Sequence, residues 1–214
     1  NTIYKILIKI NLKIYLLLLF LSIPFILIKY FHDDYNYYHL PYLNVIFDYK
    51  IIFGLANINT VLSYPQNTWL DFVGLFRIPI LDSNVSHILN ATIFIFFILF
   101  NIEKFNSSQN KYLKIYSVLL IIFSLSIFSR LRDHGLEISP QLILLIVSYL
   151  IIETYLEPSI DLEKSLKKIL ILCMTAILLR ISSISIIPVV FIICLKYYKV
   201  TFNIIGNKKF LFYC

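Results

Sequence analysis

Six apolar segments, separated by loops that carry most of the charged residues, constrain the fold of this chain more than any other feature. They run over about residues 6–30, 86–102, 112–129, 140–156, 169–179 and 184–197. About 20 apolar residues are needed for a helix to cross a bilayer. Because 59% of the 214 residues are hydrophobic and only 14% are charged, one water-soluble core could not bury these side chains. We therefore expect an all-α protein, a polytopic transmembrane helical bundle of about six spans.

The basic residues predict how these spans are oriented. With the N-terminus in the cytoplasm, thirteen of them fall on the inner side: Lys5, Lys9, Lys13, Lys104, Lys111, Lys114, Lys164, Lys167, Lys168, Lys196, Lys199, Lys208 and Lys209. Six fall on the outer side: Lys29, Lys50, Arg77, Arg130, Arg132 and Arg180. Cytoplasmic loops carry an excess of Lys and Arg, so 13 against 6 agrees with six spans. Merging the last two segments into one span moves the last four Lys outward, giving 9 against 10 and removing the asymmetry.

The kind of basic residue also differs between the two sides, because all four Arg fall on the outer side. A guanidinium binds phosphate through two parallel hydrogen bonds and stays charged, so an outward Arg set suits an anionic lipid phosphate. The alternative is that four residues are too few to make a pattern. The net charge of +7 follows from Lys residues that flank apolar segments, so we expect membrane lipid and no nucleic acid as a partner.

Two outer loops are expected, over about residues 31–85 and 130–139. The first is by far the longest loop, and loops of that length are usually functional or contain short helices. Within residues 68–77, apolar side chains recur at helical spacing: Trp69, Phe72, Val73 and Phe76. This pattern predicts a short amphipathic helix that lies in the membrane interface, with Trp69 at the level of the lipid headgroups.

An acidic pair, Asp33 and Asp34, follows the first apolar segment within the stretch from His32 to Pro41, which also holds Tyr38 and His39. A carboxylate at a membrane surface suits a general base acting on a substrate delivered by the lipid. The structural alternative is that the pair caps a helix end. A metal site from His32, Asp33 and His39 is a further alternative, although their spacing fits no standard ligand pattern.

The second outer loop concentrates charged and titratable side chains within eleven residues: Arg130, Arg132, Asp133, His134 and Glu137. They can bind substrate, or they can form an Arg–Asp and Arg–Glu network that simply closes the loop and contributes little. Arg180, beside Ser182 and Ser183, forms a further outer cluster. Asn57, which follows Gly54 and Ala56, offers hydrogen bonds in the first loop. Glu153 and His87 are expected to snorkel toward the membrane surface or to be locally bonded, and not to belong to a functional site.

Several classes of site are not indicated by the sequence. The three cysteines, Cys173, Cys194 and Cys214, show no CxxC spacing, so we expect neither a disulfide framework nor a zinc site. Walker, GxSxG and HExxH patterns are absent from the sequence. The composition is rich in Ile, Asn, Lys, Tyr and Phe, which is typical of an AT-rich bacterial genome. We therefore expect a multi-pass protein of the bacterial cytoplasmic membrane.

The acidic pair and the candidate residues of the outer loops, taken with the order of the apolar segments, resemble a known family. One span, a large outer loop that opens with an acidic pair, and further spans follow the plan of the GT-C class of glycosyltransferases. The chain is also similar to a group of bacterial polytopic membrane proteins of that general type. The similarity lies in an ordered set of short stretches: residues 32–34, 38–41, 50–57, 69–70 and 133–135, with Gln141 after them. The resemblance covers about residues 1–185.

The resemblance implies that a sugar is transferred from a polyprenyl-phosphate donor to a glycan or lipid acceptor at the outer face of the membrane. Asp33 or Asp34 would be the base on the acceptor hydroxyl, with inversion at the anomeric carbon. Arg130, Arg132 and Arg180 are our candidates for holding the lipid phosphate, where fixed charge stabilises a leaving group. No cofactor is expected, although some members bind a divalent metal.

Two other functions and a purely structural role as a membrane subunit remain open, although the long first outer loop argues against the structural role. A polysaccharide transporter or flippase would place charged residues inside its spans, whereas the span centres here are almost free of charge. An O-antigen polymerase would place Arg-rich chemistry in large later loops. Because the chain starts without Met, ends at Cys214 and has too few spans for a GT-C enzyme, we expect residues 1–214 to be one incomplete transmembrane domain from the N-terminal part of a longer protein.

Overall fold

Helices account for all the regular structure in the part of the chain that the computed structural model describes. That part comprises residues 12–27, 37, 40–49, 54, 57, 85–132, 137–157 and 160–206. Its elements are α2 (Leu12–Leu27), α3 (Leu40–Tyr49), α5 (Val85–Ser107), α6 (Lys111–Ser126), η5 (Phe128–Arg132), α7 (Ile138–Leu156), α8 (Leu162–Leu179), η6 (Ile181–Ile186), α9 (Ile187–Lys196) and α10 (Tyr198–Gly206). The expectation of an all-α fold is confirmed for these residues.

Polar side chains and a proline fix where several helices begin. Asn110 precedes α6 and its side chain accepts a hydrogen bond from the backbone N–H of Tyr112. Asp161 precedes α8 and accepts from the backbone N–H of Lys164 at 3.1 Å. Each cap satisfies one of the N–H groups that the first turn of a helix leaves without a partner. Pro188 lies in the first turn of α9, where its missing N–H costs nothing.

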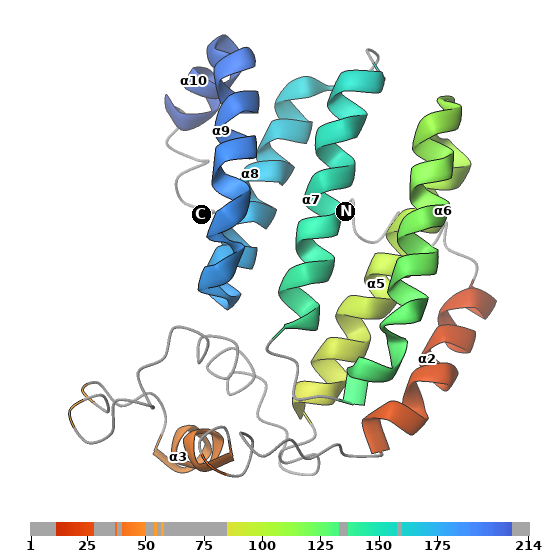
Figure 1. The fold of residues 1–214 in the computed structure, drawn as a ribbon, viewed down its shortest axis with the longest axis vertical. Helices are drawn as coiled ribbons and strands as arrows, with labels where there is room; N and C mark the ends of the chain where they lie inside the picture. Colours follow the sequence, from red (N-terminus) through yellow and green to blue (C-terminus); the bar gives the residue numbers. More distant parts are fainter. Residues whose placement is uncertain are drawn as a thin grey trace.

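Short connections make neighbouring helices antiparallel, and α7 lies at the centre of the bundle (Figure 1). Residues 108–110 join α5 to α6, and residues 157–161 join α7 to α8. One core cluster joins α5, α6 and α7 through Phe94, Phe97, Leu113, Leu142 and Tyr149. A second joins α7 to α8, α9 and α10 through Val147, Leu150, Leu166, Ile169, Val190, Ile193 and Ile204. Because α7 contributes to both clusters, it holds the two halves of the bundle together.

The expectation of six spans is met only in part. Among the described residues, two helices are long and apolar enough to cross a membrane, over Leu89–Ser107 and Ile138–Leu156. A third is possible if Ile181–Lys196 and Tyr198–Gly206, bent by 102° at their junction, count as one span. Two other predicted spans do not qualify: α6 has only 16 residues, and the first seven residues of α8 include four charged ones, Glu163, Lys164, Lys167 and Lys168. The residues on either side of α2 lie outside the description, so the predicted span over residues 6–30 stays a prediction.

Large apolar side chains nevertheless face outward on the short helices. On α6 they include Ile115, Leu119, Ile122 and Phe123, and on α9 they include Phe191, Ile192 and Leu195. A soluble monomer rarely exposes an apolar surface of this extent. The pattern is therefore typical of helices that face lipid or another apolar partner.

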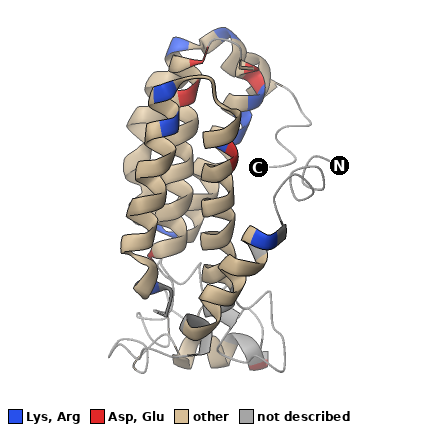
Figure 2. Cartoon of the chain, turned by 90° about the vertical axis from the view of Figure 1, so that its right-hand side faces the viewer, with Lys and Arg blue, Asp and Glu red and all other residues tan. Residues whose placement is uncertain are grey.

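Most charged residues of the described part of the chain belong to one end of the bundle, the end where α5 meets α6 and α7 meets α8 (Figure 2). The predicted inner residues Lys104, Lys111, Lys164 and Lys196 all belong to helix ends at this lysine-rich end. The opposite end holds α3, the start of α5, η5 and the turn at Arg180 (Figure 1). We call it the arginine end. The short helix α3 lies within the expected first outer loop, at residues for which the sequence predicted no particular helix. The helix predicted over residues 68–77 lies outside the described residues and stays a prediction.

Candidate functional site

The second expected outer loop and the turn that follows α8, which the sequence predicts to lie on the same membrane face, meet at the arginine end. Because α7 and α8 are antiparallel, Glu137, at the start of α7, lies beside Arg180, which follows α8. The Arg180 Nη2 donates a hydrogen bond to Glu137 Oε1 at 2.8 Å. These two residues are 43 positions apart in the chain, so only the pairing of the helices brings them together.

Arg180 is held in place by the backbone around it. Its N–H donates to the carbonyl of Ala176 at 3.0 Å, and its carbonyl accepts from the N–H of Ser183 at 2.9 Å. Its backbone is extended, with φ −152° and ψ 117°, so the chain leaves α8 here and turns into η6. This break aims the guanidinium back over the start of α7.

The Arg180 guanidinium has a free hydrogen-bonding position. Its side chain is 24% exposed, whereas that of Glu137 is 54% exposed. The Nη1 atom is buried and has no hydrogen-bond partner in the described part of the chain. A buried donor without a partner costs free energy, and a charged one costs more than a neutral one. An anionic oxygen beside Nη1 would remove that cost, so Arg180 can bind an anion while keeping its contact with Glu137.

The structure does not join the other described candidates to this pair. Arg130, in η5, is exposed, and its backbone N–H donates to the carbonyl of Ile127 at 2.9 Å. Asn57 is exposed in a turn whose Gly54 has φ 86°, a left-handed conformation that suits glycine. Within the described ranges, neither side chain forms a hydrogen bond or ion pair with Arg180 or Glu137. The structure contains an Arg–Glu ion pair of the kind that would close the second outer loop. Glu137 forms it with Arg180, which lies outside that loop.

The remaining predicted site residues lie outside the described part of the chain. They are His32, Asp33, Asp34, Tyr38, His39, Asp133 and His134. The backbone of Arg132 belongs to η5, but its side chain lies outside the description, as does that of His87 on α5. The assignment of a base and of a substrate site to these residues therefore stays a prediction.

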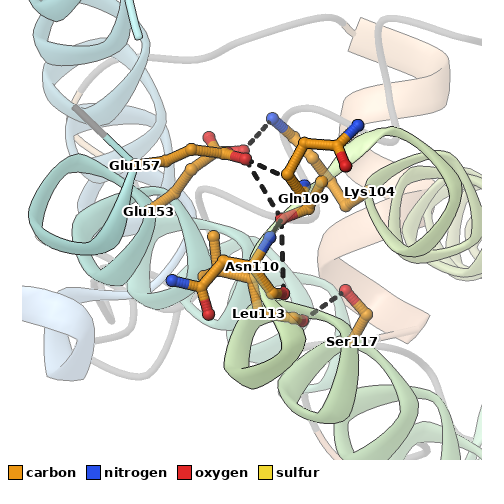
Figure 3. A network of polar contacts seen from close by, with 8 residues as sticks. Lys104, Gln109, Asn110, Leu113, Ser117, Glu153 and Glu157 are labelled. Atoms are coloured by element: carbon orange, nitrogen blue, oxygen red, sulfur yellow. Dashed lines mark hydrogen bonds and ion pairs between the residues drawn. The ribbon is translucent and has the colours of Figure 1, made fainter. Parts of the chain in front are cut away.

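A second polar cluster, at the lysine-rich end, joins the α5–α6 turn to the end of α7 (Figure 3). Lys104 on α5 forms an ion pair with Glu153 on α7 at 2.5 Å, and the Glu153 side chain is only 5% exposed. The Lys104 ammonium also lies 5.8 Å from the Phe100 ring centre and 5.7 Å from that of Tyr149. Glu153 is thus paired with a residue of another helix, 49 positions away in the chain, and not with a local partner.

Glu157, which directly follows α7, completes this cluster. Its Oε1 accepts hydrogen bonds from Ser108 Oγ at 3.3 Å and from the Gln109 backbone N–H at 3.1 Å. The Asn110 side chain donates to the Leu156 carbonyl at 3.2 Å. The sequence did not predict this cluster, because its members lie at the ends of α5 and α7 and in the turns that follow them, and they meet only through the packing of these helices. Acidic residues at the end of one apolar segment, and a lysine at the end of another, were the available signal.

Metal ligands are not gathered anywhere in the described ranges. No group of three or more His, Cys, Asp and Glu side chains there is placed to hold a metal ion. Cys173 and Cys194 are both free thiols. The alternative metal site of His32, Asp33 and His39 lies outside those ranges.

The fold and its two polar ends define an all-helical protein in which at least α5 and α7 are suited to cross a membrane. The chain belongs to the family described as a domain of unknown function (DUF8201), whose model matches residues 1–213. No curated protein and no solved structure matches it. The residues of the chain itself are therefore the basis for a proposal about its function.

Proposed function

We propose that this chain is part of a membrane glycosyltransferase of the GT-C type, which transfers a sugar from a polyprenyl-phosphate donor to a cell-envelope glycan or lipid. The reaction would take place at the outer face of the bacterial cytoplasmic membrane, at the arginine end of the bundle. The observation that carries the proposal is the buried, unpartnered Nη1 of Arg180 at this end. It supplies a charged donor where a lipid phosphate is expected.

The proposed chemistry divides between two sets of residues. Asp33 or Asp34 removes the proton from the acceptor hydroxyl, whose oxygen attacks the anomeric carbon as the bond to the lipid phosphate breaks. Negative charge then develops on the departing phosphate, and Arg180 is placed to stabilise it. Arg130 and Arg132 belong to η5 at the same end of the bundle, so they are further candidates for this role.

A comparison of Arg180→Gln with Glu137→Gln tests this role. We expect Arg180→Gln to lower the amount of transferred sugar by about 100-fold, as loss of one charge-stabilising donor does in other active sites. We expect Glu137→Gln to keep most of the product, because a half-exposed ion pair contributes about 0–1 kcal/mol. The measurement is mass spectrometry of cell-surface glycans from strains that produce each variant from the chromosomal gene, at equal membrane abundance.

The opposite result separates a site from a structural contact. If Arg180→Gln and Glu137→Gln lower the product and the membrane abundance by the same amount, the pair only closes the loop. If neither changes the glycan, the proposed phosphate site is wrong and a transporter or scaffold becomes the better proposal. Arg180→Lys adds a third arm, since it keeps the charge but loses the two-pronged hydrogen bonding of a guanidinium.

The proposed orientation makes a separate prediction. Single cysteines introduced at Gln109 and at His134, in a chain without its native cysteines, should react differently with a thiol reagent that does not cross membranes. Intact cells should show labelling at position 134 and none at position 109, because the lysine-rich end is expected in the cytoplasm. Labelling at 109 alone would invert the orientation and move the proposed chemistry to the wrong face.

A further inference from the structure

A pocket of about 290 Å³ opens at the lysine-rich end, between the ends of α5 and α7 and the start of α8. Its polar lining holds three ammonium groups, three carboxylates and the serines Ser107 and Ser165. Lys104, Glu153, Glu157, Asp161, Lys164 and Lys168 supply the charges. The formal charges of these six groups cancel, so their hydrogen bonds decide what the pocket can accept.

Each of the three carboxylates already has a partner. Glu153 forms an ion pair with the Lys104 ammonium. Glu157 accepts hydrogen bonds from the Ser108 hydroxyl and from the Gln109 backbone N–H. Asp161 caps α8 by accepting from the Lys164 backbone N–H. The acidic groups of the pocket are therefore committed to contacts within the protein.

The polar side chains that the first two turns of α8 contribute to the pocket, by contrast, have no such partner among the described residues. The Lys164 and Lys168 ammonium groups form no ion pair with a carboxylate of the described residues, whereas their neighbour Lys167 pairs with Glu163 outside the pocket. Ser165 is only 5% exposed, and its Oγ has no hydrogen-bond partner in the described chain. A buried hydroxyl without a partner costs free energy, and a ligand oxygen would satisfy it.

The electrostatics around Lys168 favour an anion. Partial burial, and after it the positive charges of Lys104 and Lys164, lower the pKa of Lys168, while the charges of Glu153 and Glu103 act in the opposite direction. The three ammonium groups thus repel one another. The N-terminal end of α8 adds the positive end of a helix dipole, which also attracts negative charge.

We propose that this pocket binds a phosphate group, held by the Lys164 and Lys168 ammonium groups and by the Ser165 hydroxyl. A phospholipid headgroup at the cytoplasmic surface and a free phosphate ion present the same chemistry to these donors. The site is at the opposite end of the bundle from Arg180, so it does not depend on the proposed glycosyltransferase activity.

The test uses the full-length protein purified in an uncharged detergent, with its thermal unfolding midpoint as the readout. One arm adds inorganic phosphate, with chloride at equal ionic strength as the reference. The other adds phosphatidylglycerol in mixed micelles, with an uncharged detergent as the reference. We expect a rise in the midpoint in at least one arm, and the arm that gives it identifies the source of the phosphate group.

Variants on α8 make the assignment specific. Lys164→Gln with Lys168→Gln should weaken the response at least about tenfold in ligand concentration, because two charge-assisted hydrogen bonds are lost. Lys167→Gln removes the same charge from the same helix outside the pocket, and it should keep the response. Ser165→Ala should raise the midpoint slightly or leave it unchanged without ligand, because its buried hydroxyl has no hydrogen-bond partner among the described residues. It should weaken the response to the ligand.

Two results would overturn the proposal. The first is that neither inorganic phosphate nor phosphatidylglycerol raises the midpoint of the wild-type protein. The second is that Lys167→Gln lowers the response as much as the double substitution does, which would indicate general attraction to a basic surface. If the double Gln variant does not fold, Lys164→Arg combined with Lys168→Arg is tested in its place. A folded double Arg variant whose midpoint does not rise with the phosphate ligand would also refute the site.

Discussion

Asp33→Asn or Asp34→Asn in the full-length protein is expected to abolish sugar transfer while leaving membrane abundance unchanged. Loss of a general base typically lowers a rate by about 100- to 10,000-fold. An amide cannot accept the proton of the acceptor hydroxyl, although it preserves the size of the side chain. The measurement is mass spectrometry of cell-surface glycans against a deletion strain, with membrane abundance followed by immunoblotting. The variant that reproduces the deletion glycan assigns the base.

Asp48→Asn is the matched control, because Asp48 lies on α3, in the same expected outer loop, and is exposed. It should leave the glycan unchanged. If Asp33→Asn and Asp34→Asn both keep the wild-type glycan, the acidic pair is a helix-end cap and the proposed activity fails. A transporter or a scaffold would then be the better proposal for the chain. The phosphate pocket on α8 would be unaffected by that result.

Lys104→Met is expected to lower the stability of the bundle more than any other single loss of a charge among the described residues. It leaves the Glu153 carboxylate buried without its partner, which typically costs about 3–5 kcal/mol. We expect a value of about 3 kcal/mol, because the Lys104 side chain is 20% exposed and water reaches one side of the pair. The measurement is the thermal or denaturant midpoint of the protein in detergent.

Two companion variants show whether burial is the cause. Lys167→Met breaks the pair with Glu163 on the exposed face of α8, and it should cost about 0–1 kcal/mol. Lys104→Met combined with Glu153→Leu should recover much of the lost stability, because no charge is then left buried. Equal effects of Lys104→Met and Lys167→Met would mean that the Lys104–Glu153 pair is as well solvated as a surface pair.

The sequence predicted the class of fold and the position of several helices, because apolar content and periodicity are local properties of the chain. The segments predicted over residues 86–102, 140–156 and 169–179 correspond to α5, α7 and α8. The turn between the last two segments, placed near Arg180–Ser183, corresponds to the break at Arg180 and η6. The number of spans was predicted less well, because an apolar segment does not reveal how long its helix is, as α6 shows with 16 residues.

The candidate residues were predicted individually, but their partners were not. The sequence singled out Glu137 and Arg180, and it gave no reason to pair them, because residues 43 positions apart meet only through the packing of α7 on α8. The same holds for Lys104 and Glu153, which are 49 positions apart and belong to α5 and α7. Composition and charge along the chain determined a helical, apolar protein with a lysine-rich end. Only the register between packed helices decided which charges are paired and which donors, on Arg180 and Ser165, are left without a partner.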